Sequence, residues 1–159
     1  MLIIVTGVSG TGKTTIGSGL ANHFNLPFFD ADHFHPEENI AKMSQGIPLN
    51  DQDRLPWLEA LAKQLRESEK TGGAVLACSA LKESYRQILK VNPSVQWIHL
   101  EGNRDLIWER MLARKNHYMK AGMLDSQIST WEEPDYGLKL SISDSPDEMI
   151  ETALEYLKQ

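Results

Sequence analysis

The sequence is short of cysteine, of basic charge and of long apolar stretches. Its 159 residues include one cysteine, Cys78, so no disulfide can form within the chain. The net charge is −6, with 16 basic and 22 acidic residues, which argues against a nucleic-acid backbone as the main partner. No apolar run approaches the roughly 18 residues of a membrane-spanning helix. We therefore expect a cytoplasmic protein that binds neither membranes nor nucleic acid.

The composition that remains is that of an ordinary folded domain. Apolar residues make up 41% of the chain and charged residues 24%. A chain of this length can bury roughly 70% of its unfolded surface without disulfides or metals. We find no internal repeat, low-complexity segment or linker, so we predict a single domain over residues 1–159.

Short apolar strands alternate with helical segments along the whole chain. The predicted strands are residues 2–6, 26–29, 74–81, 95–101 and 138–143. Apolar residues at helical spacing fill most of the intervals, and Ser145 with Glu148 has the pattern of a capping box. This alternation predicts an α/β fold in which a five-stranded parallel sheet has helices on both faces, a three-layer α/β/α sandwich. The polar, basic segment at about residues 114–122 is expected to be a mobile lid.

The first strand is followed by a complete phosphate-binding loop. Residues 7–14 read GVSGTGKT and match G-x-x-x-x-G-K-[ST], placed between a strand and a helix as a P-loop requires. We expect Lys13 to reach the β- and γ-phosphates of a nucleotide and the Thr14 hydroxyl to bind Mg²⁺. The backbone of the loop should bind phosphate oxygens at the helix N-terminus. The remaining residues assigned to this contact are Gly7, Val8, Ser9, Gly10, Thr11, Gly12 and Thr15.

The sequence lacks the further motifs that other classes of P-loop protein carry. There is no N-K-x-D sequence of the kind by which GTPases recognise guanine. The third and fourth strands do not end in the aspartate with which motor and transporter ATPases hold the metal. The metal's second protein ligand must therefore come from elsewhere in the chain.

The stretch FFDADHFHP, residues 28–36, supplies two carboxylates. Asp30 and Asp32 are two residues apart and would face the same side of an extended chain. If the second strand lies beside the first, Asp30 arrives next to the phosphate loop and can bind Mg²⁺. Asp32 would then accept a proton from a substrate hydroxyl, as a small-molecule kinase needs. The alternative is that one of the pair, Asp32 before Asp30, caps the next helix.

Four stretches resemble the gluconate kinases of the shikimate-kinase-like P-loop type. They are GVSGTGKTT, DADHFHPEENIAKMSQGIPLNDQDRLPWL, CSALKESYR and ARKNHYMKAGML, and they spread over roughly residues 3–135. The resemblance implies that the chain transfers the γ-phosphate of ATP to the 6-hydroxyl of D-gluconate with Mg²⁺. A loop near residues 144–146 would, by analogy, contact adenine. We keep a homodimer as a candidate assembly.

A sugar-acid pocket needs cations for the carboxylate and polar groups for the hydroxyls. The candidates are His35, Arg54, Lys82, Tyr85 and Arg86. Lys82 and Arg86 are four residues apart, so one helix face could direct both at the same anion. Each candidate also has a plainer role: a solvated helix face for Lys82 and Arg86, a local ion pair for Arg54, and a turn cap for His35.

Basic residues also gather at the predicted lid. We expect Arg114, at the junction of helix and loop, to neutralise the transferring phosphoryl group, and Arg110 to contact the nucleotide. The alternative is a solvated basic helix end, which the helix dipole also favours.

Two rival functions remain at this point. A shikimate or nucleoside-monophosphate kinase would share the scaffold, but shikimate kinases carry a triple-glycine turn where this chain has CSALK. A nucleotide-binding regulator would need no second pocket, and the aspartate pair with its polar neighbours argues against it.

Overall fold

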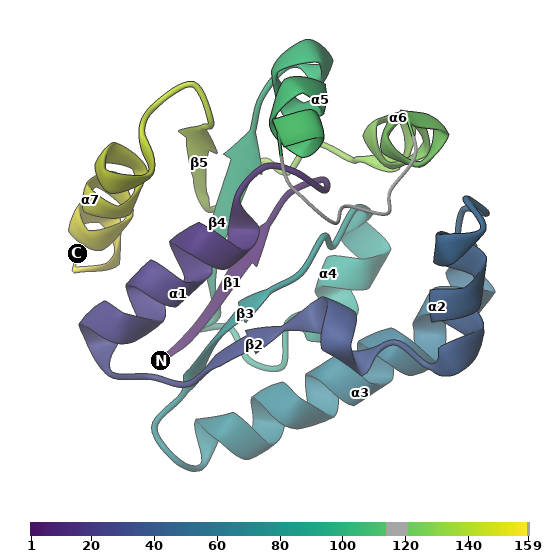
Figure 1. Ribbon diagram of the computed structural model, residues 1–159. Coiled ribbons are helices and arrows are strands. Elements are labelled where there is room, and N and C mark those ends of the chain that lie inside the picture. Colours follow the sequence, from purple (N-terminus) through teal and green to yellow (C-terminus); the bar gives the residue numbers. More distant parts are fainter. Residues whose placement is uncertain (114–120, 159) are drawn as a thin grey trace.

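Five parallel strands form the centre of the structure, a computed structural model that describes residues 1–113 and 121–158 (Figure 1). The strands are β1 (Leu2–Thr6), β2 (Phe28–Asp30), β3 (Ala74–Ala77), β4 (Gln96–Glu101) and β5 (Leu138–Ser141). Their order in the sheet is β2-β3-β1-β4-β5, and every neighbouring pair is parallel. The predicted α/β fold with a five-stranded parallel sheet is confirmed.

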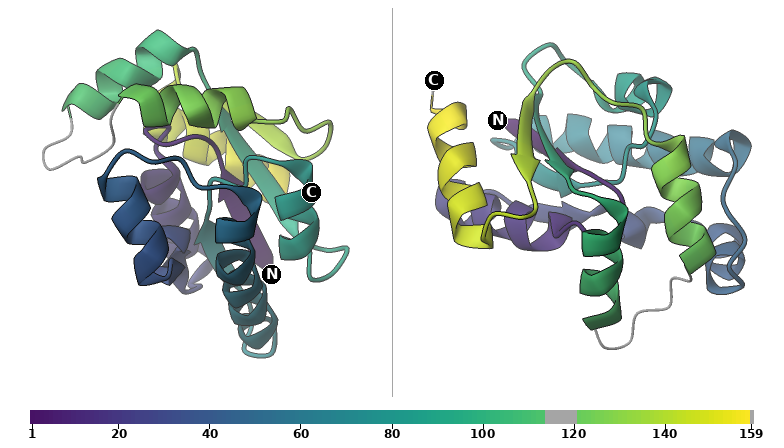
Figure 2. Two further views of the ribbon diagram at one scale, coloured as in Figure 1. Left: turned by 90° about the vertical axis from the view of Figure 1, so that its right-hand side faces the viewer. Right: turned by 90° about the horizontal axis from the view of Figure 1, so that it is seen from above.

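Helices cover both faces of this sheet. They are α1 (Lys13–Phe24), the short 3₁₀ helix η1 (Ala31–Phe34), α2 (Glu37–Ser44), α3 (Asp51–Glu69), α4 (Glu83–Leu89), α5 (Arg104–Ala113), α6 (Ala121–Thr130) and α7 (Pro146–Leu157). Helices α1 and α7 pack together on one face, and α3 and α4 pack together on the other (Figure 2). Within residues 1–113 and 121–158, no helix combines the length and the apolar character needed to cross a bilayer.

The strands read as continuous apolar runs because they are buried on both faces. Leu2, Ile3, Ile4 and Val5 of β1 are at most 3% exposed. The helix ends follow local signals as well. The Ser145 side chain accepts a hydrogen bond from the backbone N–H of Glu148, which completes the predicted capping box at the start of α7.

The order of the strands does not place β2 beside β1, as our prediction for Asp30 required. Leu76 of β3 is in register with Ile4 of β1 on one side and with Phe29 of β2 on the other. The second strand is therefore separated from the first by the third, and Asp30 does not reach the phosphate loop through direct strand pairing.

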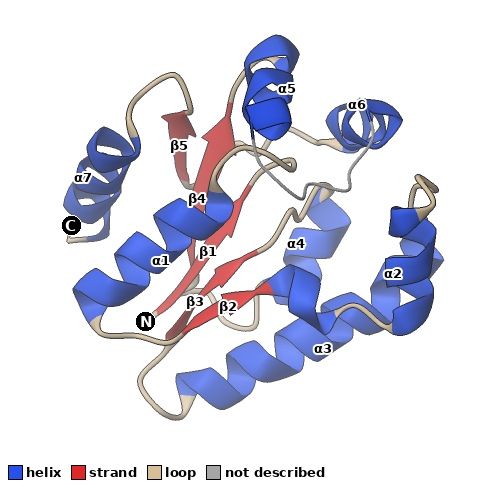
Figure 3. Ribbon diagram, viewed as in Figure 1, coloured by secondary structure: helices blue, strands red, loops and turns tan. Residues whose placement is uncertain are grey.

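The last two residues of the predicted lid and the segment after it also differ from expectation. Residues 121–122 belong to the first turn of α6, whereas residues 114–120 lie outside the described part of the chain. The sequence of α6, AGMLDSQIST, contains glycine, serine and threonine, which are weak helix formers. Met123 and Leu124 are buried at 4% and 0% exposure, so tertiary packing rather than propensity stabilises this helix. Figure 3 shows α6 as a helix separate from α5.

Candidate active site

The phosphate loop joins the end of β1 to the start of α1. Gly7 has a φ of 149°, and a Cβ there would lie 2.9 Å from the carbonyl oxygen of Leu100, so only glycine fits without displacing β4. Gly12 has a φ of 93° and is the N-cap of α1. The loop thus aims its backbone N–H groups and the positive end of a twelve-residue helix at one point, which is the arrangement that binds phosphate.

A cavity of about 520 Å³ lies directly over this loop. Its volume is in the range of small-molecule sites. Of the residues predicted for the site, those that line the cavity are Ser9, Gly10, Thr11, Gly12, Lys13, Thr14, Thr15, Asp30, Asp32, His35, Arg54 and Arg110. The nucleotide and acceptor halves of the prediction therefore meet in a single cavity.

Lys13 lies folded over the phosphate loop. Its Nζ donates a hydrogen bond to the carbonyl oxygen of Val8 at 3.1 Å, and the Thr11 hydroxyl donates to the same oxygen at 2.8 Å. Gly7 and Val8 do not line the cavity among the described residues. They contribute to the site through the shape of the backbone and through this shared carbonyl.

The two aspartates reach the cavity by a turn and not by an extended strand. Strand β2 ends at Asp30, and the 3₁₀ helix η1 begins at the next residue. Asp30 Oδ1 accepts a hydrogen bond from the backbone N–H of Asp32 at 2.9 Å. Our argument from extended geometry is thus wrong, although both carboxylates line the cavity. Of the two aspartates considered for a capping role, Asp30 has it.

Asp32 has an environment suited to a proton acceptor. Desolvation by neighbouring protein atoms is the main cause that raises the pKa of its carboxyl group, although the residue is exposed at the surface, and the charge of Asp30 adds to this effect. The Lys13 ammonium lowers the pKa, as does His33 to a smaller extent. A carboxylate with a raised pKa is a stronger base than a fully solvated one.

The opposite wall of the cavity carries His35 and Arg54. The imidazole of His35 is stacked on the indole of Trp57, with ring centroids 4.2 Å apart. The indole N–H of Trp57 donates to the carbonyl oxygen of Ala31 at 2.7 Å, which fixes the ring. Burial, and to a lesser extent the Arg54 charge, lower the pKa of His35 to about 4. His35 is therefore a neutral group at neutral pH.

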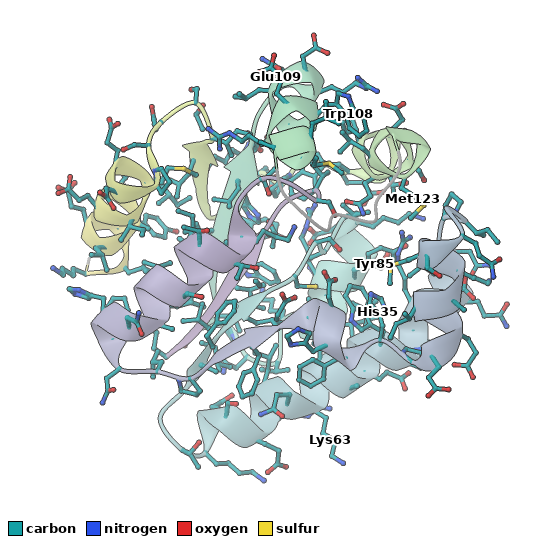
Figure 4. The ribbon with its side chains drawn as sticks, viewed as in Figure 1. His35, Lys63, Tyr85, Trp108, Glu109 and Met123 are labelled. Atoms are coloured by element: carbon teal, nitrogen blue, oxygen red, sulfur yellow. The ribbon has the colours of Figure 1, made fainter. Side chains whose placement is uncertain are left out.

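Lys82 and Tyr85 lie behind Arg54 and do not line the cavity among the described residues. The Arg54 guanidinium donates to the Tyr85 hydroxyl at 2.9 Å. That hydroxyl donates in turn to the Asp51 carboxylate, which also pairs with Lys82 Nζ at 2.9 Å. Figure 4 shows Tyr85 and His35 in the region between α2, α4 and α6. Lys82 and Tyr85 thus support the position of Arg54.

Arg86 is not a substrate-facing residue, contrary to our prediction. Its side chain is 1% exposed, and its guanidinium donates to the backbone carbonyls of Ala80 and Leu81 at 2.9 and 3.1 Å and to that of Glu132. It also lies over the Trp131 ring, 4.8 Å from the centroid. Arg86 lies within α4, whereas Lys82 is only its N-cap. The two residues therefore do not share a helix face that points at one anion.

We expect Arg86→Met to destabilise the fold without a specific effect on acceptor binding. The substitution leaves buried carbonyls without donors, at about 1–3 kcal/mol for each unsatisfied group. Chemical denaturation should show a loss of several kcal/mol in the free energy of unfolding. Lys82→Met is the matched control, because it removes a neighbouring cation from an exposed ion pair and should change stability little. Normal stability of Arg86→Met together with a raised KM for the acceptor would restore the substrate role.

Arg110 extends from α5 toward the start of α7. One of its guanidinium nitrogens donates to the carbonyl oxygen of Ile142, and Pro146 and Met149 line the cavity nearby. This agrees in position with the predicted adenine-side loop at residues 144–146. Arg114, the other predicted arginine, lies outside the described residues.

Sequence reasoning missed two polar residues that bond to predicted site residues. Gln127 of α6 accepts a hydrogen bond from the backbone N–H of Ser9 at 2.8 Å, which ties α6 to the phosphate loop. Asn39 of α2 is 3% exposed and bonds to His35. Gln127 falls in a segment with no helix signal, so nothing in the sequence indicated it. Asn39 could have been found as a polar residue on the inward face of a predicted helix.

Comparisons with known proteins identify the family. The shikimate kinase family model matches residues 9–136. A probable gluconokinase of Dictyostelium discoideum is 41% identical over 99% of this chain and 86% of its own length. The gluconokinase of Gluconobacter oxydans (strain 621H) is 40% identical over 98% of this chain and 90% of its own length. The chain belongs to the gluconokinase family.

Solved structures agree with this family membership. A gluconokinase from Sinorhizobium meliloti 1021 superimposes with a TM-score of 0.91 at 38% identity, and the match covers 99% of this chain and 91% of that one. A shikimate kinase from Aquifex aeolicus has a TM-score of 0.70 at 19% identity over 99% and 96% of the two chains. The first places this gluconokinase-family chain among its relatives, and the second supports the shared fold alone.

Proposed function

We propose that this protein transfers the γ-phosphoryl group of ATP to the 6-hydroxyl of D-gluconate, giving 6-phospho-D-gluconate and ADP. The observation that carries the proposal is the single cavity with the phosphate loop on one wall and Asp32, His35 and Arg54 on the others. Family membership supplies the phosphoryl donor and the acceptor class. The cavity supplies a position for each of them.

The roles of the residues follow from their chemistry. The loop N–H groups and Lys13 bind the β- and γ-phosphates. The 6-hydroxyl of gluconate attacks the γ-phosphorus, Asp32 accepts the hydroxyl proton, and the bond to the β-phosphate oxygen breaks to release ADP. Arg54 pairs with the gluconate carboxylate or a hydroxyl, supported by Tyr85 and Lys82. Arg110 lies on the nucleotide side.

The donor set fits a magnesium ion. Thr14 and Asp30 both line the cavity at the phosphate loop, and they offer the hard oxygen ligands that Mg²⁺ prefers. The described residues contain no cluster of three or more acidic, histidine or cysteine ligands. Mg²⁺ usually takes one or two protein ligands together with phosphates and water. The ion would neutralise phosphate charge when bound.

Several finer expectations belong to the same proposal. Arg114 and a lid at residues 114–122 stay predictions for closing the site over the phosphoryl group. A single catalytic domain over residues 1–159, a cytoplasmic location, a homodimer and the absence of a nucleic-acid partner stay predictions as well.

The test is ADP release with Mg·ATP and a panel of acceptors: D-gluconate, L-idonate, shikimate, AMP and none. We expect turnover on D-gluconate well above the others, with the phosphomonoester at C6 detected by ³¹P NMR. Turnover on shikimate or AMP alone would overturn the acceptor assignment. Bound ATP without turnover on any acceptor would favour the regulator that the sequence left open.

A further inference from the structure

Asn39 is a buried polar residue whose contacts fix the orientation of its amide. Its Nδ2 atom lies 2.9 Å from the backbone carbonyl oxygen of Asp53 and 3.1 Å from Nδ1 of His35. A backbone carbonyl can only accept hydrogen bonds. The Asn39 atom that faces Asp53 is therefore the amide nitrogen, and its two hydrogens serve the two neighbours.

This orientation determines which nitrogen of His35 carries the ring proton. An amide N–H donates, so His35 Nδ1 must accept, and the proton of the neutral ring is on Nε2. Stacking on Trp57 holds the plane of the ring. Because Nδ1 is turned to Asn39 and His35 lines the cavity, Nε2–H is the nitrogen that faces a ligand.

Asn39 is itself held in place by the first turn of α3. The Asp53 side chain forms a capping box with Asn50 and an ion pair with Lys42 of α2 at 2.8 Å. The carbonyl that receives Asn39 thus belongs to a residue fixed on two other sides. The contacts that join α2 to α3 therefore also fix the position of the Asn39 amide.

We propose that Asn39 is a positioning residue that locks His35 as a neutral Nε2–H donor to an oxygen of the sugar acid. That the ligand is a sugar acid rests on the proposed function, whereas the fixed tautomer of His35 does not. Beside Arg54, a neutral donor binds an acceptor oxygen without placing a second positive charge in the same wall. The pair selects acceptors with a carboxylate or hydroxyl oxygen at this point, because an analogue without it leaves the N–H unsatisfied.

The lock can be tested on the wild-type protein without any substrate. The chain has five histidines, and His35→Gln would assign the His35 signals in a long-range ¹H–¹⁵N spectrum. We expect a pyridine-type nitrogen shift for Nδ1 and a pyrrole-type shift for Nε2 near neutral pH. A proton on Nδ1 would overturn the proposal whatever the enzyme phosphorylates.

Two variants test the consequence for binding. Asn39→Ala removes the donor, so both tautomers of His35 should appear, and KM for D-gluconate should rise about tenfold, as for one lost hydrogen bond of about 1.4 kcal/mol. KM for ATP should stay within about twofold.

Lys42→Met is the matched control, because it removes the other contact between α2 and Asp53 but leaves His35 Nδ1 bonded. It should preserve the tautomer and the KM for gluconate. Equal effects of Lys42→Met and Asn39→Ala would mean that Asn39 acts only by docking α2, which overturns the proposal. A changed tautomer with an unchanged gluconate KM would also overturn it, because His35 would then not bind the acceptor. Failure of the proposed function would appear separately, as wild-type protein inactive on D-gluconate.

Discussion

Asp32→Asn is expected to lower kcat for gluconate phosphorylation by about 10²–10⁴-fold, the usual contribution of a positioned general base. Asparagine has nearly the same shape as aspartate, so the cavity and the turn at η1 should persist. The amide cannot accept the proton of the 6-hydroxyl as that oxygen attacks phosphorus. Because the lost interaction belongs to the chemical step, KM for ATP should change little. Steady-state kinetics with both substrates varied would measure the effect.

A suitable control is Asp105→Asn, which changes an exposed carboxylate on α5 whose side chain is 93% exposed. It should leave kcat unchanged and so exclude a general effect of lost negative charge. Asp30→Asn should behave in a third way, with a kcat that recovers in part at high Mg²⁺ concentration, as expected for a metal ligand. A loss of less than tenfold in Asp32→Asn would remove the base role from this residue.

The parts of the site that the sequence predicted are those specified by neighbours along the chain. The phosphate loop, the strand and helix that flank it and the cap at Ser145 depend on contacts within a few residues, and each was placed correctly. Asp30 and Asp32 were identified for their charge in an apolar context. The geometric reason was wrong because β3 lies between β1 and β2, and strand order is decided by pairing between distant segments.

The failure at Arg86 has the same physical origin. Spacing of four residues on a helix shows that two side chains are near one another, but it does not show which face points to the core. Besides the carbonyls of Ala80 and Leu81, the Arg86 guanidinium donates to the carbonyl of Glu132, 46 residues further along the chain. No local pattern contains that contact. Asn39 and Gln127 were missed for a related reason, since their partners lie on other elements.

Lys13→Met should lower kcat/KM by about 10²–10³-fold, the effect of removing one preorganised charge from a developing anion. Methionine has a similar length and keeps the apolar stem in place. In the structure, the ammonium lies 3.1 Å from the Val8 carbonyl, within the loop that receives the phosphates, so it is already positioned before nucleotide binds. Lys13→Arg should not restore activity, because a planar guanidinium does not fit the place of a compact ammonium.

The control for this prediction is Lys63→Met on α3, an exposed lysine that does not line the cavity and that Figure 4 shows at the lower edge of the molecule. It makes the same chemical change and should keep wild-type kinetics. Thermal unfolding of Lys13→Met should be close to wild type, since methionine keeps the apolar stem in place and the lost hydrogen bond to Val8 contributes only about 1 kcal/mol. If Lys13→Met kept more than a tenth of wild-type kcat/KM, the loop would bind phosphate through its backbone N–H groups and helix dipole alone. The size of the effect therefore distinguishes the contribution of the Lys13 charge from that of the loop backbone.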